Sequence, residues 1–212
     1  MGSLLKKTTA LLLAGGKSSR MGSPKGLLRL ADRFWIEDQV EHLRTVGVED
    51  IVIILGYGAD SYYEALPLLR EGLISGMEVR VIENTQPELG QFSSILKGLS
   101  KTALDHSVFI LPIDVPCAAE AAWVTLFERL HRNNDVNVCI PTFSERGGHP
   151  VLLSHYFCNS LLSRSPQSRL DLEIQNLPEK KVARLEIVDP RVTFNLNTIE
   201  DWEKFKVLSS LA

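Results

Sequence analysis

Residues 8–25 read TTALLLAGGKSSRMGSPK and join a strand signal to a loop signal. The unbroken apolar run at 10–14 is typical of a strand buried on both faces of a parallel sheet. A turn at Gly15-Gly16 follows, and then a polar loop with three cations, Lys17, Arg20 and Lys25. Backbone N–H groups at a glycine turn can approach an anion closely, and spaced cations can surround a polyphosphate. The stretch therefore indicates a phosphate-binding loop; an ordinary strand-to-helix connection is the alternative that the spacing leaves open.

Two familiar glycine motifs do not fit this chain. The P-loop requires a glycine five residues before its Gly-Lys-Ser, and Leu11 stands there relative to Gly16-Lys17-Ser18. The dinucleotide fingerprint is not met at Gly56-Tyr57-Gly58, because Ser61 stands where the third glycine is needed. This second mismatch disfavours an NAD(P)-dependent oxidoreductase.

Three short segments in fixed order resemble a known signature: Leu13-Ala14-Gly15-Gly16, Arg20-Met21-Gly22 and Pro24-Lys25-Gly26. Together they resemble the MobA-like nucleotidyltransferases, which attach a nucleotide to molybdenum cofactor and are related to sugar- and polyol-phosphate nucleotidyltransferases. The resemblance extends from Thr8 to Phe205. It implies an α/β fold of three layers, the Rossmann-like nucleotide-diphospho-sugar transferase fold, with a mostly parallel sheet and helices on both faces.

The composition is that of an ordinary soluble protein. The 212 residues suit one nucleotidyltransferase domain over 1–212, with 1–7 as a flexible N-terminus. A net charge of −3 gives no reason to expect a nucleic-acid partner, and no apolar run approaches the roughly 20 residues that span a bilayer. Three isolated cysteines and the lack of a signal-peptide pattern favour reduced thiols and a cytoplasmic location.

Apolar runs alternate with helical patterns along the chain, which predicts βα units around a parallel sheet. Strands are expected at 10–14, 50–55, 79–83, 108–111, 136–140 and 150–153. Helical patterns are centred on 36–43, 61–66, 92–99, 123–130, 156–162 and 198–205, with Thr198 as the cap of the last. The polar segment 163–179 is left as loop or lid. Residues 182–188 and 191–194 are predicted to be late strands, at an edge or antiparallel.

Asp114 is the strongest single candidate for chemistry. It follows a predicted buried strand and stands between Pro112 and Pro116, which restrict the local backbone. In open α/β sheets ligands bind outside the carboxyl ends of the strands, where the 8–25 loop would also lie. A carboxylate there suits a Mg²⁺ ion shared with a triphosphate, although an aspartate that caps the next helix is the alternative. The resemblance implies that Asp114 is the metal-binding aspartate.

The resemblance places the second metal ligand at Asn197. Relatives carry Asp-x-Asp-Thr-Pro-x-Asp near the C-terminus, whereas this chain reads Asn-Leu-Asn-Thr-Ile-Glu-Asp at 195–201. An amide oxygen can bind Mg²⁺ but brings no charge, so a weaker metal site is expected. The two asparagines also keep open a non-catalytic nucleotide sensor, and the segment would serve equally as the entry to the last helix.

Other segments resemble the parts of the family that hold base, ribose and acceptor. Asn84 and the stretch 90–94 resemble the segment that holds base and ribose in cytidylyl enzymes. The residues expected to bind nucleotide are Leu13, Ala14, Gly15, Gly16, Lys17, Asn84, Gly90 and Ser94. Gly148-His149-Pro150 resembles a motif near the acceptor, with the role of His149 left open.

The resemblance implies transfer of a nucleotidyl group from CTP or GTP to a phosphorylated acceptor, with release of pyrophosphate. Arg20 and Lys17 would hold the leaving phosphates, Lys25 would neutralise the α-phosphate, and Asp114 with Asn197 would hold Mg²⁺. The expected catalytic residues are therefore Lys25, Arg20 and Asp114. The first loop resembles guanylyl enzymes, whereas 91–94 and 148–151 resemble cytidylyl enzymes, which favours CTP slightly. The acceptor is expected to be molybdopterin-type cofactor, with a sugar or polyol phosphate as the alternative.

Overall fold

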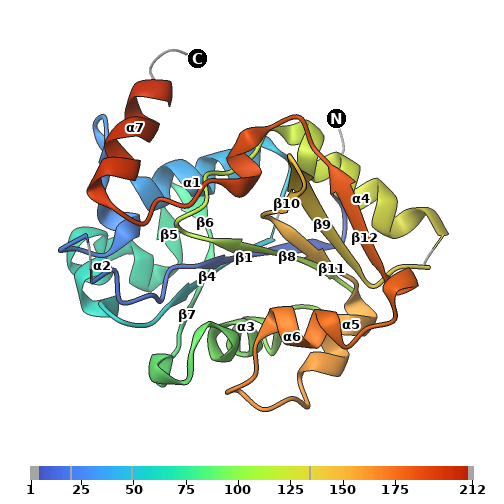
Figure 1. Ribbon diagram of the computed structural model, residues 1–212. Helices are drawn as coiled ribbons and strands as arrows, with labels where there is room; N and C mark the ends of the chain where they lie inside the picture. Colours follow the sequence, from blue (N-terminus) through green and yellow to red (C-terminus); the bar gives the residue numbers. More distant parts are fainter. Residues whose placement is uncertain (1–4, 20, 49, 134, 210–212) are drawn as a thin grey trace.

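The computed structural model describes residues 5–19, 21–48, 50–133 and 135–209. Its central sheet has the order β10-β9-β11-β8-β1-β4-β7, and β12 pairs with β9 (Figure 1). The strands of this sheet are β1 (Thr8–Leu13), β4 (Asp50–Leu55), β7 (Arg80–Glu83), β8 (Ser107–Pro112), β9 (Val138–Phe143), β10 (Arg146–Gly147), β11 (Val151–Leu153) and β12 (Val182–Glu186).

The strand β1 lies inside the sheet, between β4 and β8, and all six of its residues are buried. It pairs in parallel with β4 on one side and β8 on the other. Leu13 is level with Ile54 and with Pro112, so these strands end at the same edge. The glycine turn after β1 and the Asp114 segment after β8 are therefore neighbours, as the sequence predicts.

Helices cover both faces of the sheet, which confirms the expected three layers (Figure 1). Successive strand residues alternate between two cores: Leu12 and Ile53 pack on one side, Leu11 and Ile54 on the other. The first core lies under α1 (Trp35–Thr45), α2 (Ala59–Ala65), α4 (Glu120–Asn133) and α7 (Ile199–Ser209). The second lies under α3 (Gln91–Leu99), α5 (His155–Leu161) and α6 (Leu170–Gln175).

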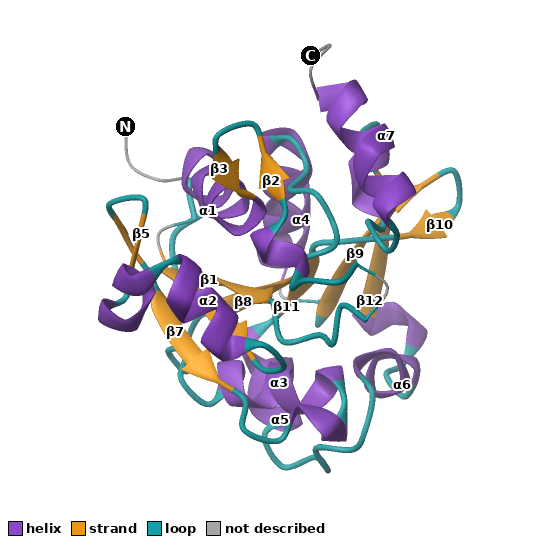
Figure 2. Cartoon of the chain, turned by 90° about the vertical axis from the view of Figure 1, so that its left-hand side faces the viewer, coloured by secondary structure: helices purple, strands orange, loops and turns teal. Residues whose placement is uncertain are grey.

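Several short elements lie outside the simple βα pattern. Two-residue strands form the hairpins β2 (Arg29–Leu30) with β3 (Arg33–Phe34) and β5 (Leu73–Ile74) with β6 (Met77–Glu78). Figure 2 shows the first hairpin beside α1. Five 3₁₀ turns complete the described elements: η1 (Lys25–Leu27), η2 (Pro67–Glu71), η3 (Pro87–Leu89), η4 (Glu179–Lys181) and η5 (Pro190–Thr193).

The C-terminal third departs most from expectation. The predicted strand at 191–194 is wrong, because Asp189 accepts the Arg191 N–H and Pro190 opens the 3₁₀ turn η5. The strand β12 is at an edge as expected, but it is parallel to β9. The polar segment 163–179, left as loop or lid, contains α6. In the described part of the chain no helix is long and apolar enough to cross a membrane.

Candidate functional site

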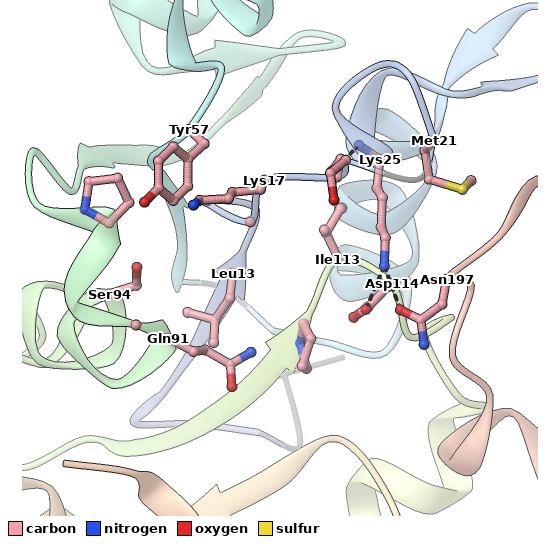
Figure 3. Close-up of a pocket in the computed structure, with 17 residues that line it drawn as sticks. Leu13, Lys17, Met21, Lys25, Tyr57, Gln91, Ser94, Ile113, Asp114 and Asn197 are labelled. Atoms are coloured by element: carbon pink, nitrogen blue, oxygen red, sulfur yellow. Dashed lines mark hydrogen bonds and ion pairs between the residues drawn. The ribbon is translucent and has the colours of Figure 1, made fainter. Parts of the chain in front are cut away.

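A cavity of about 520 Å³ opens at the carboxyl ends of β1 and β8 (Figure 3). Its size is within the range of ordinary ligand sites. Seventeen residues line it: Leu13, Gly15, Gly16, Lys17, Ser18, Ser19, Met21, Lys25, Tyr57, Pro87, Gly90, Gln91, Ser94, Pro112, Ile113, Asp114 and Asn197. Most of the residues predicted from the sequence are thus brought to one place.

The glycine turn after β1 packs backbone against backbone on the turn after β4. A Cβ on Gly15 would lie 3.2 Å from the Gly56 nitrogen, and a Cβ on Gly56 would lie 2.9 Å from the Gly15 oxygen. The Tyr57 N–H donates to that same Gly15 oxygen at 3.2 Å. The two turns can approach this closely because neither carries a side chain at the contact.

Lys25 lies at the other side of the cavity from Lys17 (Figure 3). Its Nζ is 2.8 Å from Asp114 Oδ2 and 2.8 Å from Asn197 Oδ1. The Lys25 N–H donates to Ser18 Oγ at 3.1 Å, which fixes the start of η1 after the turn at Pro24. The ammonium, carboxylate and amide come from three distant parts of the chain.

Backbone hydrogen bonds bring Asp114 and Asn197 together. The Ile113 N–H donates to the Leu13 oxygen at 3.0 Å, which continues the β1–β8 pairing one residue beyond β8. The Leu196 N–H donates to the Asp114 oxygen at 2.8 Å. Thr198 then caps α7 as predicted, since its Oγ1 accepts the Asp201 N–H at 3.1 Å.

The donor set suits a hard divalent cation that is shared with a ligand. One carboxylate oxygen and one amide oxygen lie 2.8 Å from a single point, the Lys25 Nζ. Among the described residues no group of three His, Cys, Asp or Glu side chains could hold a metal on its own. Magnesium is commonly bound by one or two protein oxygens together with substrate phosphates and water, so Asp114 and Asn197 fit that role.

Two of the expected nucleotide-binding residues do not line the cavity. Asn84 is buried, and its Nδ2 donates to Ser93 Oγ at 2.8 Å and to Ser94 Oγ at 3.0 Å. Asn84 therefore reaches the cavity lining only indirectly, through its bond to Ser94, which does line the cavity. Ala14 is also buried, and its N–H donates to the Ile54 oxygen. Arg20, expected to hold phosphates, lies outside the described residues.

Sequence reasoning missed Tyr57, which lines the cavity beside Lys17. The Lys17 Nζ lies 4.9 Å from the centre of the Tyr57 ring (Figure 3). An ammonium over an aromatic face is attracted by the ring. The available signal was the Gly56-Tyr57-Gly58 turn, an aromatic residue between two glycines at the end of a buried strand.

A second cavity of about 560 Å³ adjoins the first and shares Gly90 and Gln91 with it. His149 and Arg184 are among its lining residues. His149 Nδ1 lies 3.3 Å from the Ile110 oxygen, and burial lowers the pKa of its ring, which favours the neutral form. Arg184 is exposed and forms no ion pair within the described ranges.

The fold and the glycine-rich loop after β1 both lie within a stretch that matches a known protein family. Residues 10–180 match the model of the MobA-like NTP transferase domain. The chain belongs to that family. It is 27% identical to a probable molybdenum cofactor guanylyltransferase of Carboxydothermus hydrogenoformans over 98% of this chain and 99% of that protein. The suspected resemblance is thereby confirmed.

Two further relatives match this MobA-like domain over only part of their length. The bifunctional protein GlmU of Syntrophomonas wolfei is 26% identical over 63% of this chain and 28% of that protein. The CMP-5'-(3-aminopropyl)phosphonate synthase of Streptomyces rubellomurinus is 32% identical over 50% of this chain and 17% of that protein. The chain thus spans less than a third of the length of these two proteins.

Solved structures share the fold of this domain. A nucleotidyl transferase from Methanothermobacter thermautotrophicus has a TM-score of 0.75 and 21% identity, with 96% of this chain and 97% of that chain covered. Rv0371c from Mycobacterium tuberculosis, in complex with manganese, has a TM-score of 0.70 and 19% identity, with 95% and 99% covered. These likenesses confirm the nucleotide-diphospho-sugar transferase fold class.

Proposed function

We propose that this domain transfers a nucleoside monophosphate, from GTP in preference to CTP, to a phosphorylated acceptor of molybdopterin type. The observation that carries the proposal is the meeting of Lys25, Asp114 and Asn197 in one cavity beside the glycine turn. The sequence alone slightly favours CTP. The match over nearly the full length of a relative named as a probable guanylyltransferase instead favours GTP.

The reaction joins two anions, so the protein must neutralise charge and align the reactants. An acceptor phosphate oxygen attacks the α-phosphorus, the bond to the bridging oxygen breaks, and pyrophosphate leaves with the electron pair. Lys17 and the N–H groups of the Gly15-Gly16 turn hold the leaving phosphates, and Lys25 stabilises the charge at the α-phosphate. Arg20 is proposed to join Lys17 in this role.

Asp114 and Asn197 are the residues proposed to hold Mg²⁺. When bound, the ion supplies charge neutralisation and a template for the phosphate oxygens. No protein nucleophile is needed, because an acceptor phosphate is already ionised at neutral pH. Gly90 and Ser94, supported by Asn84, are proposed to contact base and ribose at the start of α3.

The acceptor is proposed to occupy the second cavity, which continues from the first across Gly90 and Gln91. The neutral ring of His149 offers a hydrogen-bond position there, and the guanidinium of Arg184 offers a charge to an anionic group. The resemblance to sugar-phosphate nucleotidyltransferases keeps a sugar phosphate as the second candidate for this cavity. One domain over 1–212 and a cytoplasmic location remain predictions.

Pyrophosphate release tests the proposal. GTP, CTP, UTP and ATP are each supplied with Mg²⁺ and with molybdopterin-type cofactor or a panel of sugar and polyol phosphates. Release is expected with one nucleotide and one acceptor, and Asp114→Ala should abolish it. Asp135→Ala is the matched control, because it removes an exposed carboxylate that pairs with Arg129 on α4, outside both cavities. Tight triphosphate binding without release from any pair would favour the nucleotide sensor.

A further inference from the structure

Trp35 is the first residue of α1, and it is 1% exposed. It does not line the cavity that holds Lys25, Asp114 and Asn197. Its backbone and its ring nevertheless contact the three segments that deliver those residues. Each of the three connections is a different physical interaction, and each lies within a few residues of a proposed functional group.

The first connection leads to Lys25. The Trp35 N–H donates to the Leu28 oxygen at 2.8 Å. Leu28 is the C-cap of η1, and its own N–H donates to the Lys25 oxygen at 3.2 Å. The start of α1 and the 3₁₀ turn of Lys25 are therefore joined by two consecutive backbone hydrogen bonds.

The second connection leads to Asp114. The Trp35 indole N–H donates to the Ile113 oxygen at 2.6 Å, across 78 positions of sequence. The carbonyl group of Ile113 belongs to the peptide that joins it to Asp114, so this bond restrains the rotation of that peptide. Ile113 is itself 6% exposed, and its carbonyl would lose its indole donor without Trp35.

The third connection leads to Asn197. The Trp35 ring packs edge-on against Trp202, with centroids 5.3 Å apart, and against Phe205, with centroids 5.2 Å apart. Both partners are on α7, whose first turn begins two residues after Asn197. Edge-to-face packing of buried rings is directional, so it fixes the position of α7 relative to α1.

We propose that Trp35 is a positioning residue that sets the spacing of Lys25, Asp114 and Asn197, and with it the affinity of the metal site. The inference rests on the proposed function, because it assumes that Asp114 and Asn197 hold the ion. Substitution of a residue that orients metal ligands from the outer shell typically lowers metal affinity or activity by about 10- to 100-fold. Trp35 acts through the Ile113 peptide and α7.

The test uses Trp35→Phe, which keeps an aromatic ring and removes the indole N–H. Trp123→Phe is the matched control, because Trp123 is also fully buried and its indole N–H donates to the Ala118 oxygen at 3.2 Å. Mn²⁺ binding is measured by electron paramagnetic resonance of the free ion, with the α,β-methylene analogue of GTP or of CTP present. Pyrophosphate release is measured in parallel over a range of Mg²⁺ concentrations.

Trp35→Phe should weaken Mn²⁺ binding about tenfold, whereas Trp123→Phe should leave it near the wild-type value. Added Mg²⁺ should restore much of the turnover of Trp35→Phe, which a general loss of stability would not allow. Equal Mn²⁺ affinity in the two variants would overturn the positioning role. If the wild type binds Mn²⁺ but transfers no nucleotide, the proposed function is refuted. The Mn²⁺ affinities of Trp35→Phe and Trp123→Phe would still test the positioning role.

Discussion

Lys25 and Asp114 form an ion pair of 2.8 Å although 89 positions separate them in the chain. The side chains are 13% and 24% exposed, so water screens this pair less than a surface pair. The amide oxygen of Asn197 accepts from the same ammonium. Under the proposed function, a divalent cation held by the same two oxygens would therefore compete with the Lys25 ammonium for them.

Lys25→Met should separate catalysis from metal binding. Loss of one group that stabilises charge in a transition state costs about 10²–10³ in kcat. Mn²⁺ binding without nucleotide should rise, because no ammonium then competes for Asp114. Turnover and Mn²⁺ titration measure the two effects, with Lys97→Met on the exposed face of α3 as control. Unchanged turnover at saturating substrate would refute the assignment of Lys25.

Asn197→Asp should strengthen the metal site, because it adds a second carboxylate beside Asp114. We expect the Mg²⁺ concentration for half-maximal turnover to fall about tenfold, equivalent to about 1.4 kcal/mol. Asn195→Asp is the control, since its amide donates to the Thr193 oxygen and does not line the cavity. If both variants lower the Mg²⁺ requirement equally, the effect comes from the added negative charge alone, and Asn197 is not a metal ligand.

The sequence predicted the parts of the site that local chemistry determines. An apolar run that ends in glycines places Lys17 and Gly15 at the edge of the sheet, and Asp114 follows the neighbouring strand to the same edge. The direction in which a polar side chain points could not be predicted in this way. Asn84 follows a strand in the same way, but it turns inward to bind Ser93 and Ser94, and its type alone does not show this.

The topology after β9 could not be predicted for a similar reason. The strand β11 has only three residues, all buried, and it runs antiparallel between β8 and β9. Such a short apolar run shows no period that distinguishes the two directions. The three connections of Trp35 were equally hidden, because an aromatic residue at the start of an amphipathic helix indicates only a core position.

Gly148 and Gly147 offer a matched test of packing beside the second cavity. A Cβ on Gly148 would collide with the Val192 carbonyl, whereas a Cβ on Gly147 would meet side-chain atoms at 3.6 Å. Gly148→Ala should therefore lower the free energy of unfolding by about 1–3 kcal/mol, the usual cost of overpacking. Gly147→Ala should be near neutral. Thermal or urea unfolding of both variants measures the difference, and equal stability would show that η5 moves aside freely.

His149 should make the protein less stable in mild acid. Burial lowers the pKa of its ring, and the Ile110 carbonyl and Asp114 oppose this only in part. The unfolded state therefore binds a proton more readily below about pH 6.5, so the free energy of unfolding falls as the pH falls toward the folded pKa. His149→Gln should flatten the dependence of Tm on pH between about 7.5 and 5.5. If His149→Gln keeps the wild-type slope, His149 is not buried as a neutral ring.

His42 acts with the opposite sign, because a hydrogen bond to Asp38 raises its pKa. His42→Gln should therefore steepen the same dependence of Tm on pH.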